Sequence, residues 1–175
     1  MPTPRRIACV VAPERFRDEE LAEPRRLLEQ AGHRVIVAST RPGTAAGMRG
    51  ARVTVQSTVA ALREEDLDLL VIAGGSGAPA HLWDHEPLRR LAVAMHRAGK
   101  PVAAICLAPP VLARAGLLAG RRATTFPDRR ALLELKRGGA SYVDQAVVRD
   151  GTIVTGSGPE AAADFGAALL QIVSP

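Results

Sequence analysis

Val102-Ala103-Ala104-Ile105-Cys106-Leu107-Ala108-Pro109-Pro110 is the stretch of sequence that decides the fold. Its first four residues form a short apolar run, which is typical of a buried parallel strand. The two prolines suit the first turn of a helix, where a missing N–H is tolerated. We therefore expect Cys106 at a strand–turn–helix junction on the carboxyl edge of a parallel sheet, where open α/β folds bind ligands.

The helix after Cys106 bears on the chemistry of its thiol. Free N–H groups and the positive end of the helix dipole favour a thiolate over a thiol. Cys9, in contrast, lies within a continuous apolar run, and we expect it to be a small buried hydrophobe. These two cysteines have no metal-type spacing, so the sequence predicts neither a metal site nor a disulfide framework.

Outward from this stretch, apolar runs alternate with helical patterns. Strands are expected at residues 6–12, 34–38, 67–73 and 102–105, with shorter ones at 52–55 (an edge strand) and 122–125. A hairpin with an Asp-Gly turn is expected at 147–154, a loop at 40–50, and helices at 18–31, 87–98, 111–115, 129–137 and 159–173. The alternation predicts an α/β fold, a doubly wound sandwich with a mostly parallel central sheet and helices on both faces. No linker or repeat divides residues 1–175, which we interpret as a single domain.

Composition narrows the class of protein. The chain has 175 residues, of which 47% are hydrophobic and 23% charged, as in ordinary soluble proteins. No apolar run is long enough to span a bilayer or to serve as a secretory segment, so a cytoplasmic location is expected. The net charge is +5, but the arginines are scattered among acids and the chain has one Trp and one Tyr. We therefore expect no nucleic-acid partner and no membrane partner.

A glycine loop, Gly74-Gly75-Ser76-Gly77, follows the strand expected at 67–73 and should reach the same edge of the sheet as Cys106. Glycine allows close backbone approach, so the N–H groups of Gly75 and Leu107 are candidates for an oxyanion hole. Gly74 and Ser76 are expected to line the substrate pocket. The loop lacks the spacing of dinucleotide and P-loop motifs, and no cofactor is expected.

A nucleophilic cysteine usually needs a neighbouring base or another group that tunes its pKa. His81 is the one histidine near a predicted site loop. Carboxylates are better placed, because four acids lie where the first strand gives way to the first helix. These are Glu14, Asp18, Glu19 and Glu20.

Several short motifs spread along the chain match one known family. They include the segments at 20–24 (Glu-Leu-Ala-Glu-Pro), 71–75, 104–106, 124–127 (Thr-Thr-Phe-Pro), 139–144, 150–155 and 158–159. Together they resemble the PfpI/ThiJ superfamily over nearly the full length. This resemblance implies a flavodoxin-like fold, a homodimer, and a reactive elbow cysteine at Cys106. It also implies that Glu20 is the protonated glutamate that hydrogen-bonds the thiol.

The sequence departs from that family at three positions. Leu107 stands where peptidase-like members have histidine, which argues against a peptidase. Arg17 replaces an acid at the entry to the first helix, and Phe126, expected in the substrate pocket, replaces a histidine found in some deglycase-like members. The remaining pair, Cys106 and Glu20, resembles the deglycase-like branch.

Three functions are compatible with this pattern. The first is a cofactor-free enzyme of glyoxalase or deglycase type, in which a Cys106 thiolate attacks small reactive carbonyl compounds. The second is a stress-response protein that senses oxidation through Cys106. The third is a cysteine hydrolase or hydratase acting on another small molecule.

Overall fold

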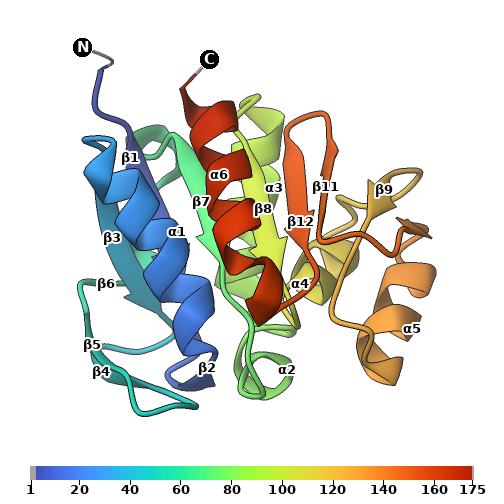
Figure 1. Cartoon of the computed structure of the whole chain (residues 1–175), viewed down its shortest axis with the longest axis horizontal. Helices are drawn as coiled ribbons and strands as arrows, with labels where there is room; N and C mark the ends of the chain where they lie inside the picture. The colour runs from blue at the N-terminus through green and yellow to red at the C-terminus, as the bar shows by residue number, and fades with distance from the viewer. Residues whose placement is uncertain (1–2, 175) are drawn as a thin grey trace.

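A seven-stranded sheet forms the centre of the computed structural model, which describes residues 3–174 (Figure 1). Its strand order is β11-β12-β8-β7-β1-β3-β6. The bounds are Val147–Asp150 for β11, Ile153–Gly156 for β12, Val102–Ile105 for β8, Leu69–Ile72 for β7, Arg6–Val10 for β1, Arg34–Ser39 for β3 and Ser57–Thr58 for β6. All neighbours pair in parallel except β11 and β12, which form the antiparallel hairpin expected around Asp150-Gly151.

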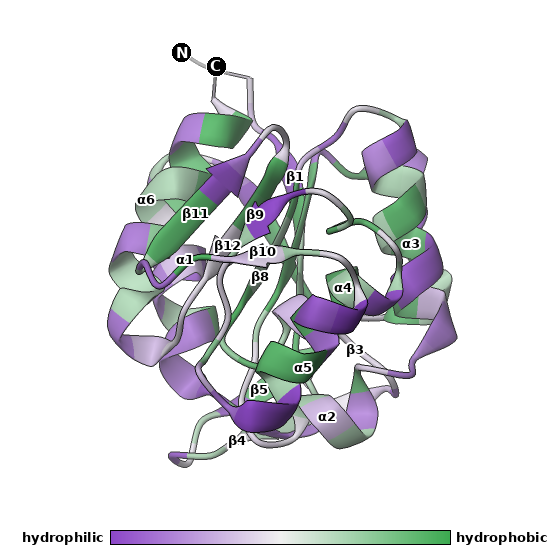
Figure 2. Ribbon diagram, turned by 90° about the vertical axis from the view of Figure 1, so that its right-hand side faces the viewer, coloured by the Kyte–Doolittle hydropathy of each residue, from purple (hydrophilic) through white to green (hydrophobic). Residues whose placement is uncertain are grey.

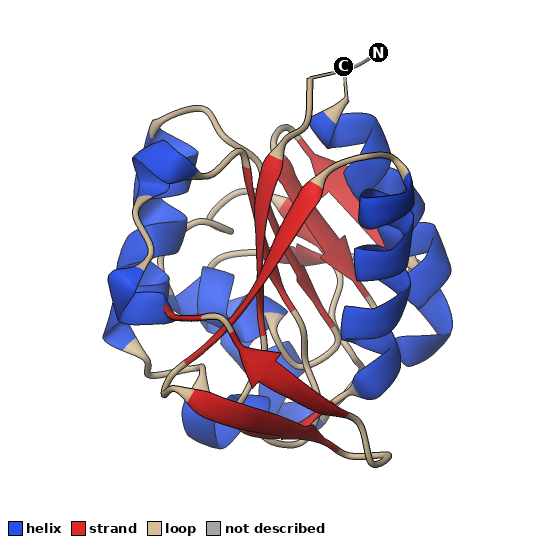
Figure 3. Cartoon of the chain, turned by 90° about the vertical axis from the view of Figure 1, so that its left-hand side faces the viewer, coloured by secondary structure: helices blue, strands red, loops and turns tan. Residues whose placement is uncertain are grey.

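Helices cover both faces of this sheet, as Figure 3 shows. The helices α1 (Asp18–Gln30) and α6 (Ala162–Val173) pack together on one face, and α3 (Glu86–Arg97) and α4 (Pro109–Arg114) lie on the other. The helix α5 (Arg129–Arg137) packs on α4, and the short α2 (Ala78–His81) follows the glycine loop. Short 3-10 turns occupy Val59–Ala61, Glu64–Asp66 and Pro159–Ala161.

The central strands are buried on both faces, which explains their sequence. Every residue of β7 and of β8 is buried, so neither strand alternates between apolar and polar residues. Figure 2 shows this apolar centre between helices whose polar residues lie mainly outside. The predicted doubly wound α/β sandwich is confirmed.

The loop predicted at residues 40–50 is wrong in part. Within it, β4 (Gly43–Gly47) pairs antiparallel with β5 (Arg52–Val55) and parallel with β2 (Glu14–Phe16). The strand at 52–55 therefore belongs to a small second sheet, and the edge strand of the central sheet next to β3 is β6. Glycine and alanine have weak strand propensity, so β4 depends on pairing with segments distant in the sequence.

Two further strands form a separate pair. The strand expected at 122–125 is shorter, β9 (Arg122–Ala123), and it pairs in parallel with β10 (Ser141–Tyr142).

The helix expected at 159–173 begins as a 3-10 turn before α6. Within residues 3–174, no helix combines the length and the apolar character that crossing a bilayer requires.

Candidate active site

The turn between β8 and α4 holds Cys106 in an uncommon backbone conformation. Its φ is 64°, in the left-handed region, which costs a non-glycine residue about 1–3 kcal/mol. Three hydrogen bonds hold it there. Cys106 N donates to the Gly156 carbonyl (2.9 Å), while its own carbonyl accepts from Phe126 N (2.9 Å) and Thr125 Oγ1 (2.6 Å). The predicted elbow is therefore a strained turn that its neighbours fix in place.

The glycine loop lies directly against this elbow. A Cβ on Gly74 would lie 2.7 Å from Leu107 N and 2.9 Å from Cys106 Cβ, so only glycine fits. At Gly75, φ is 105° and a Cβ would lie 2.4 Å from Arg17 N. This close packing places the N–H groups of Gly75 and Leu107 beside the Cys106 thiol, where both act to lower its pKa.

Glu20 lies in the first turn of α1 with its side chain directed into the protein. The residue is only 1% exposed, and Oε1 accepts a hydrogen bond from Gly74 N at 2.9 Å. The carboxyl group also interacts with the Cys106 thiol. Oε2 is buried and has no hydrogen-bond partner among residues 3–174. Gly74, expected to line the pocket, thus uses its N–H to position the acid.

Burial dominates the proton affinities of this pair. It raises the pKa of the Glu20 carboxyl to about 7, although hydrogen bonds from Cys106 and Gly74 and the charge of Arg17 act in the opposite direction. Burial also raises the pKa of the Cys106 thiol, and the Glu20 carboxylate raises it further. The N–H groups of Gly75 and Leu107 favour the thiolate, as expected of this turn, but they do not outweigh burial beside an ionised Glu20.

Arg17 brings a positive charge to the rim of this site. Its backbone N–H donates to the Gly74 carbonyl at 3.1 Å, which fastens the glycine loop to the start of α1. Its Nε donates to Glu19 Oε2 at 2.7 Å, and Arg49 lies 3.5 Å from the other oxygen of Glu19. The guanidinium lowers the pKa of Glu20, so it counteracts part of the effect of burial.

The remaining predicted site residues differ in how exposed they are and in which groups they contact. Leu107 is partly exposed, Ser76 is exposed, and the Phe126 side chain is 42% exposed. His81 lies on α2, where its Nε2 is 3.2 Å from Glu14 Oε1, and no contact in the described part of the chain joins it to Cys106. No cluster of possible metal ligands occurs within residues 3–174.

The sequence model of the DJ-1/PfpI family matches residues 5–172. The chain belongs to the DJ-1/PfpI family. Among its relatives, an uncharacterised protein of Methanocaldococcus jannaschii is 42% identical over 96% of this chain and 82% of its own length. A deglycase of Pyrococcus horikoshii is 38% identical over 82% of this chain and 85% of its own length.

Solved structures agree with this family assignment. The ThiJ/PfpI domain protein of Brachyspira murdochii superposes with a TM-score of 0.92 at 29% identity, covering 98% of this chain and 97% of its own. DJ-1beta of Drosophila melanogaster has a TM-score of 0.88 at 26% identity, covering 98% and 91%. The flavodoxin-like fold implied by the sequence is therefore confirmed for this DJ-1/PfpI protein.

Trp83 is a neighbour of the site that the sequence reasoning missed. It follows α2 and is 4% exposed, and its Nε1–H donates to the Leu107 carbonyl at 2.7 Å. The indole thus supports the residue whose N–H group faces the thiol. Its being the single tryptophan of the chain, shortly after the glycine loop, was the available signal.

Proposed function

We propose that this DJ-1/PfpI protein is a cysteine-dependent, cofactor-free enzyme that acts on small reactive carbonyl compounds, as a glyoxalase or deglycase. The observation that carries the proposal is the buried Glu20 carboxyl, held by Gly74 N–H so close to Cys106 that each group shifts the pKa of the other, beside the N–H groups of Gly75 and Leu107. The name of the Pyrococcus horikoshii relative, a deglycase, supports the same class of reaction.

In the proposed first step, the Glu20 carboxylate takes the proton of the Cys106 thiol. A pKa of about 7 for the Glu20 carboxyl lets it accept and return a proton near neutral pH. The thiolate attacks the aldehyde carbon, forming a C–S bond while the carbonyl π electrons move to oxygen. Glu20 then donates the proton to that oxygen, which gives a hemithioacetal.

The N–H groups of Gly75 and Leu107 serve two stages of this step. Before attack they donate to the sulfur and stabilise the thiolate. During attack the negative charge moves to the adjacent oxygen, and preorganised donors at that place lower the barrier. The strained turn at Cys106 keeps the sulfur within reach of both donors.

Conversion of methylglyoxal would proceed within the same covalent adduct. A hydrogen moves from the hemithioacetal carbon to the neighbouring carbon, with Glu20 as the proton carrier, and a thioester results. Water then cleaves the C–S bond, releasing lactate and the thiol. The sum is one methylglyoxal and one water giving one lactate, so no external oxidant or reductant is needed.

Leu107 makes a peptidase a poorer match. The side chain next to the thiol is aliphatic, and the Nε2 of His81, the candidate histidine, lies 3.2 Å from Glu14 Oε1. Glu20 is therefore the proton carrier of the proposed site. Homodimer formation stays a prediction from the family resemblance, which light scattering would test.

The test is lactate formation from methylglyoxal by the wild type, Cys106→Ser and Cys9→Ser. Loss of the nucleophile should lower turnover by about 100-fold or more, because the covalent route is closed. The matched Cys9→Ser variant changes a cysteine in β1 and should keep turnover within about threefold of the wild type. Equal rates for the wild type and Cys106→Ser would refute the proposal.

Oxidation sensing is a second candidate, favoured by Glu20 Oε2. This buried oxygen lacks a hydrogen-bond partner within residues 3–174. A protonated Glu20 could donate to an oxygen added to the sulfur, which would stabilise a sulfinate at Cys106.

A further inference from the structure

A pocket of about 470 Å³ lies next to the active-site elbow and takes no part in the chemistry proposed above. Ser76 of the glycine loop and Trp83 belong to its wall. The rest of the wall brings together three guanidinium groups, from Arg114, Arg130 and Arg137. Only two carboxylates face them, those of Asp84 and Glu134. Its size is that of a site for a small molecule.

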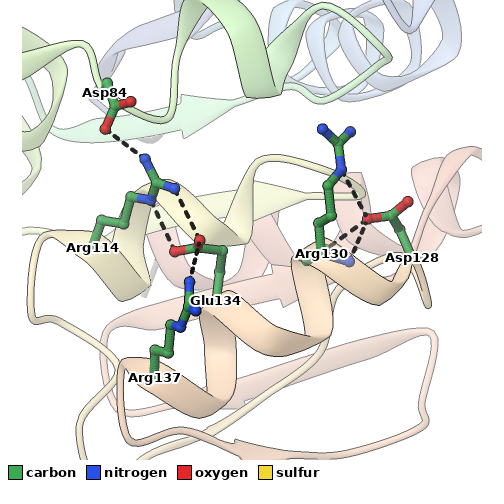
Figure 4. Close-up of polar contacts among 7 residues, drawn as sticks. Asp84, Arg114, Asp128, Arg130, Glu134 and Arg137 are labelled. Atoms are coloured by element: carbon green, nitrogen blue, oxygen red, sulfur yellow. Dashed lines mark hydrogen bonds and ion pairs between the residues drawn. The ribbon is translucent and has the colours of Figure 1, made fainter.

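Arg114 is fully engaged within the wall. Its Nε and Nη2 donate to the two oxygens of Glu134 at 2.8 and 2.9 Å, and Nη1 donates to Asp84 (Figure 4). Its guanidinium also lies 5.3 Å from the centroid of the Trp83 ring. These contacts lower the pKa of Glu134, chiefly through the Arg114 hydrogen bonds, so that this carboxylate stays charged. Arg114 is therefore a structural cation, with little left to offer a ligand.

Arg130 and Arg137, in contrast, keep most of their hydrogen-bonding groups available. Arg130 lies 5.7 Å from the Trp83 centroid, and its one ion pair in the described structure is a 4.0 Å approach of Nε to Asp128. That same Asp128 oxygen already caps α5, accepting from the backbone N–H groups of Arg130 and Ala131. Asp128 is thus largely committed to the helix.

The carboxylate nearest to Arg137 is likewise shared. Arg137 reaches Glu134 Oε1 at 3.8 Å, but this oxygen already accepts from Arg114 (Figure 4). The side chains of Arg130 and Arg137 are 68% and 67% exposed. Both arginines line the pocket, and their planar N–H forks suit carboxylate and phosphate groups.

We propose that this pocket binds the anionic group of a small molecule, a carboxylate or a phosphate, through Arg130 and Arg137. The aliphatic side chain of Leu133, which is 44% exposed, provides an apolar wall for the remainder of the ligand, whereas Trp83 is 4% exposed and lies next to the Arg114 and Arg130 guanidinium groups. Because Trp83 Nε1 donates to the Leu107 carbonyl, an occupant of the pocket is linked through one side chain to the residue that follows Cys106. Binding of the anion requires no turnover at Cys106, so it stands apart from the proposed function.

The single tryptophan provides a direct test, because Trp83 lies in the wall of the pocket. Sodium phosphate and sodium succinate are titrated separately into the protein while Trp83 fluorescence is recorded, with sodium chloride at matched ionic strength as reference. We expect a saturable change with at least one anion and none with chloride. A response to phosphate alone or to succinate alone identifies the group that the pocket prefers.

Arg130→Gln/Arg137→Gln should weaken this binding at least about tenfold, since the charge-assisted hydrogen bonds to the anion are lost. Arg129→Gln is the matched control, because Arg129 is an exposed arginine of the same helix that does not line the pocket. Calorimetry of the same titrations covers the case in which the substitutions alter the fluorescence itself. Unchanged affinity in the double variant, or an equal response to chloride, would overturn the proposal.

Discussion

The two cysteines of this chain are almost equally buried but lie in very different surroundings. Cys9 is 2% exposed and Cys106 is 5% exposed. Cys9 lies in the middle of β1, paired in register with Val37 and Val71, where burial raises its pKa to about 12. Cys106 follows the end of a strand, where its thiol lies beside a carboxyl group and two N–H donors. The comparison shows that burial alone does not make a site; polar groups directed at the sulfur do.

The largest expected difference between the two thiols is in oxidation. Mild hydrogen peroxide should convert Cys106 to a sulfenic and then a sulfinic acid, each peroxide adding one oxygen and leaving as water. Cys9 is reached only when the protein unfolds, and a stability of about 5 kcal/mol or more keeps that state below about one part in a thousand. We expect Cys106 to react at least about 100-fold faster by peptide mass spectrometry. Modification of Cys9 first would contradict the comparison.

A second difference concerns pH, because only Cys106 has a buried acid as its neighbour. Burial raises the pKa of Glu20 from 4.5 to about 7, so the folded protein holds this proton more tightly than the unfolded chain does. Raising the pH from about 4.5 to about 7 should therefore lower the free energy of unfolding by up to about 3 kcal/mol. Glu20→Gln should lack this decline, as measured by urea denaturation at several pH values.

Glu23→Gln is the matched control for that measurement. Glu23 lies one turn further along α1, where it pairs with Arg26 at the surface. Its removal should leave the decline between pH 4.5 and 7 intact. An unaltered decline in Glu20→Gln would show that another group is responsible.

The smallest expected effect is on stability: the glycine and alanine variants should rank in opposite order at the two cysteine positions. At Cys106 the positive φ favours glycine, so Cys106→Gly should be about 1 kcal/mol more stable than Cys106→Ala. Within β1 the order reverses, and Cys9→Gly should be about 1 kcal/mol less stable than Cys9→Ala. Thermal denaturation of the four variants measures both differences. The same order at both positions would mean that the turn at Cys106 relaxes.

Local patterns predicted the elements whose apolar residues follow a regular helical spacing or form an uninterrupted run. The helix expected at 129–137 coincides with α5, where Asp128 caps the first turn and apolar residues recur at helical spacing. The buried strands β7 and β8 were found from uninterrupted apolar runs bounded by glycine or proline. The strand β4 was missed, because Gly43 to Gly47 has no such pattern and is extended only through pairing with β2 and β5.

By itself the sequence determined the doubly wound class and predicted the elbow at Cys106, and resemblance to a family pointed to Glu20 as its acid. Each depends on short-range periodicity or on motifs read along the chain. Only the tertiary structure decided that burial sets the proton affinities of this pair, that Trp83 holds Leu107, and that α4 and α5 gather their arginines around one pocket. These features depend on distances between segments remote in sequence and on exclusion of water, which no local pattern encodes.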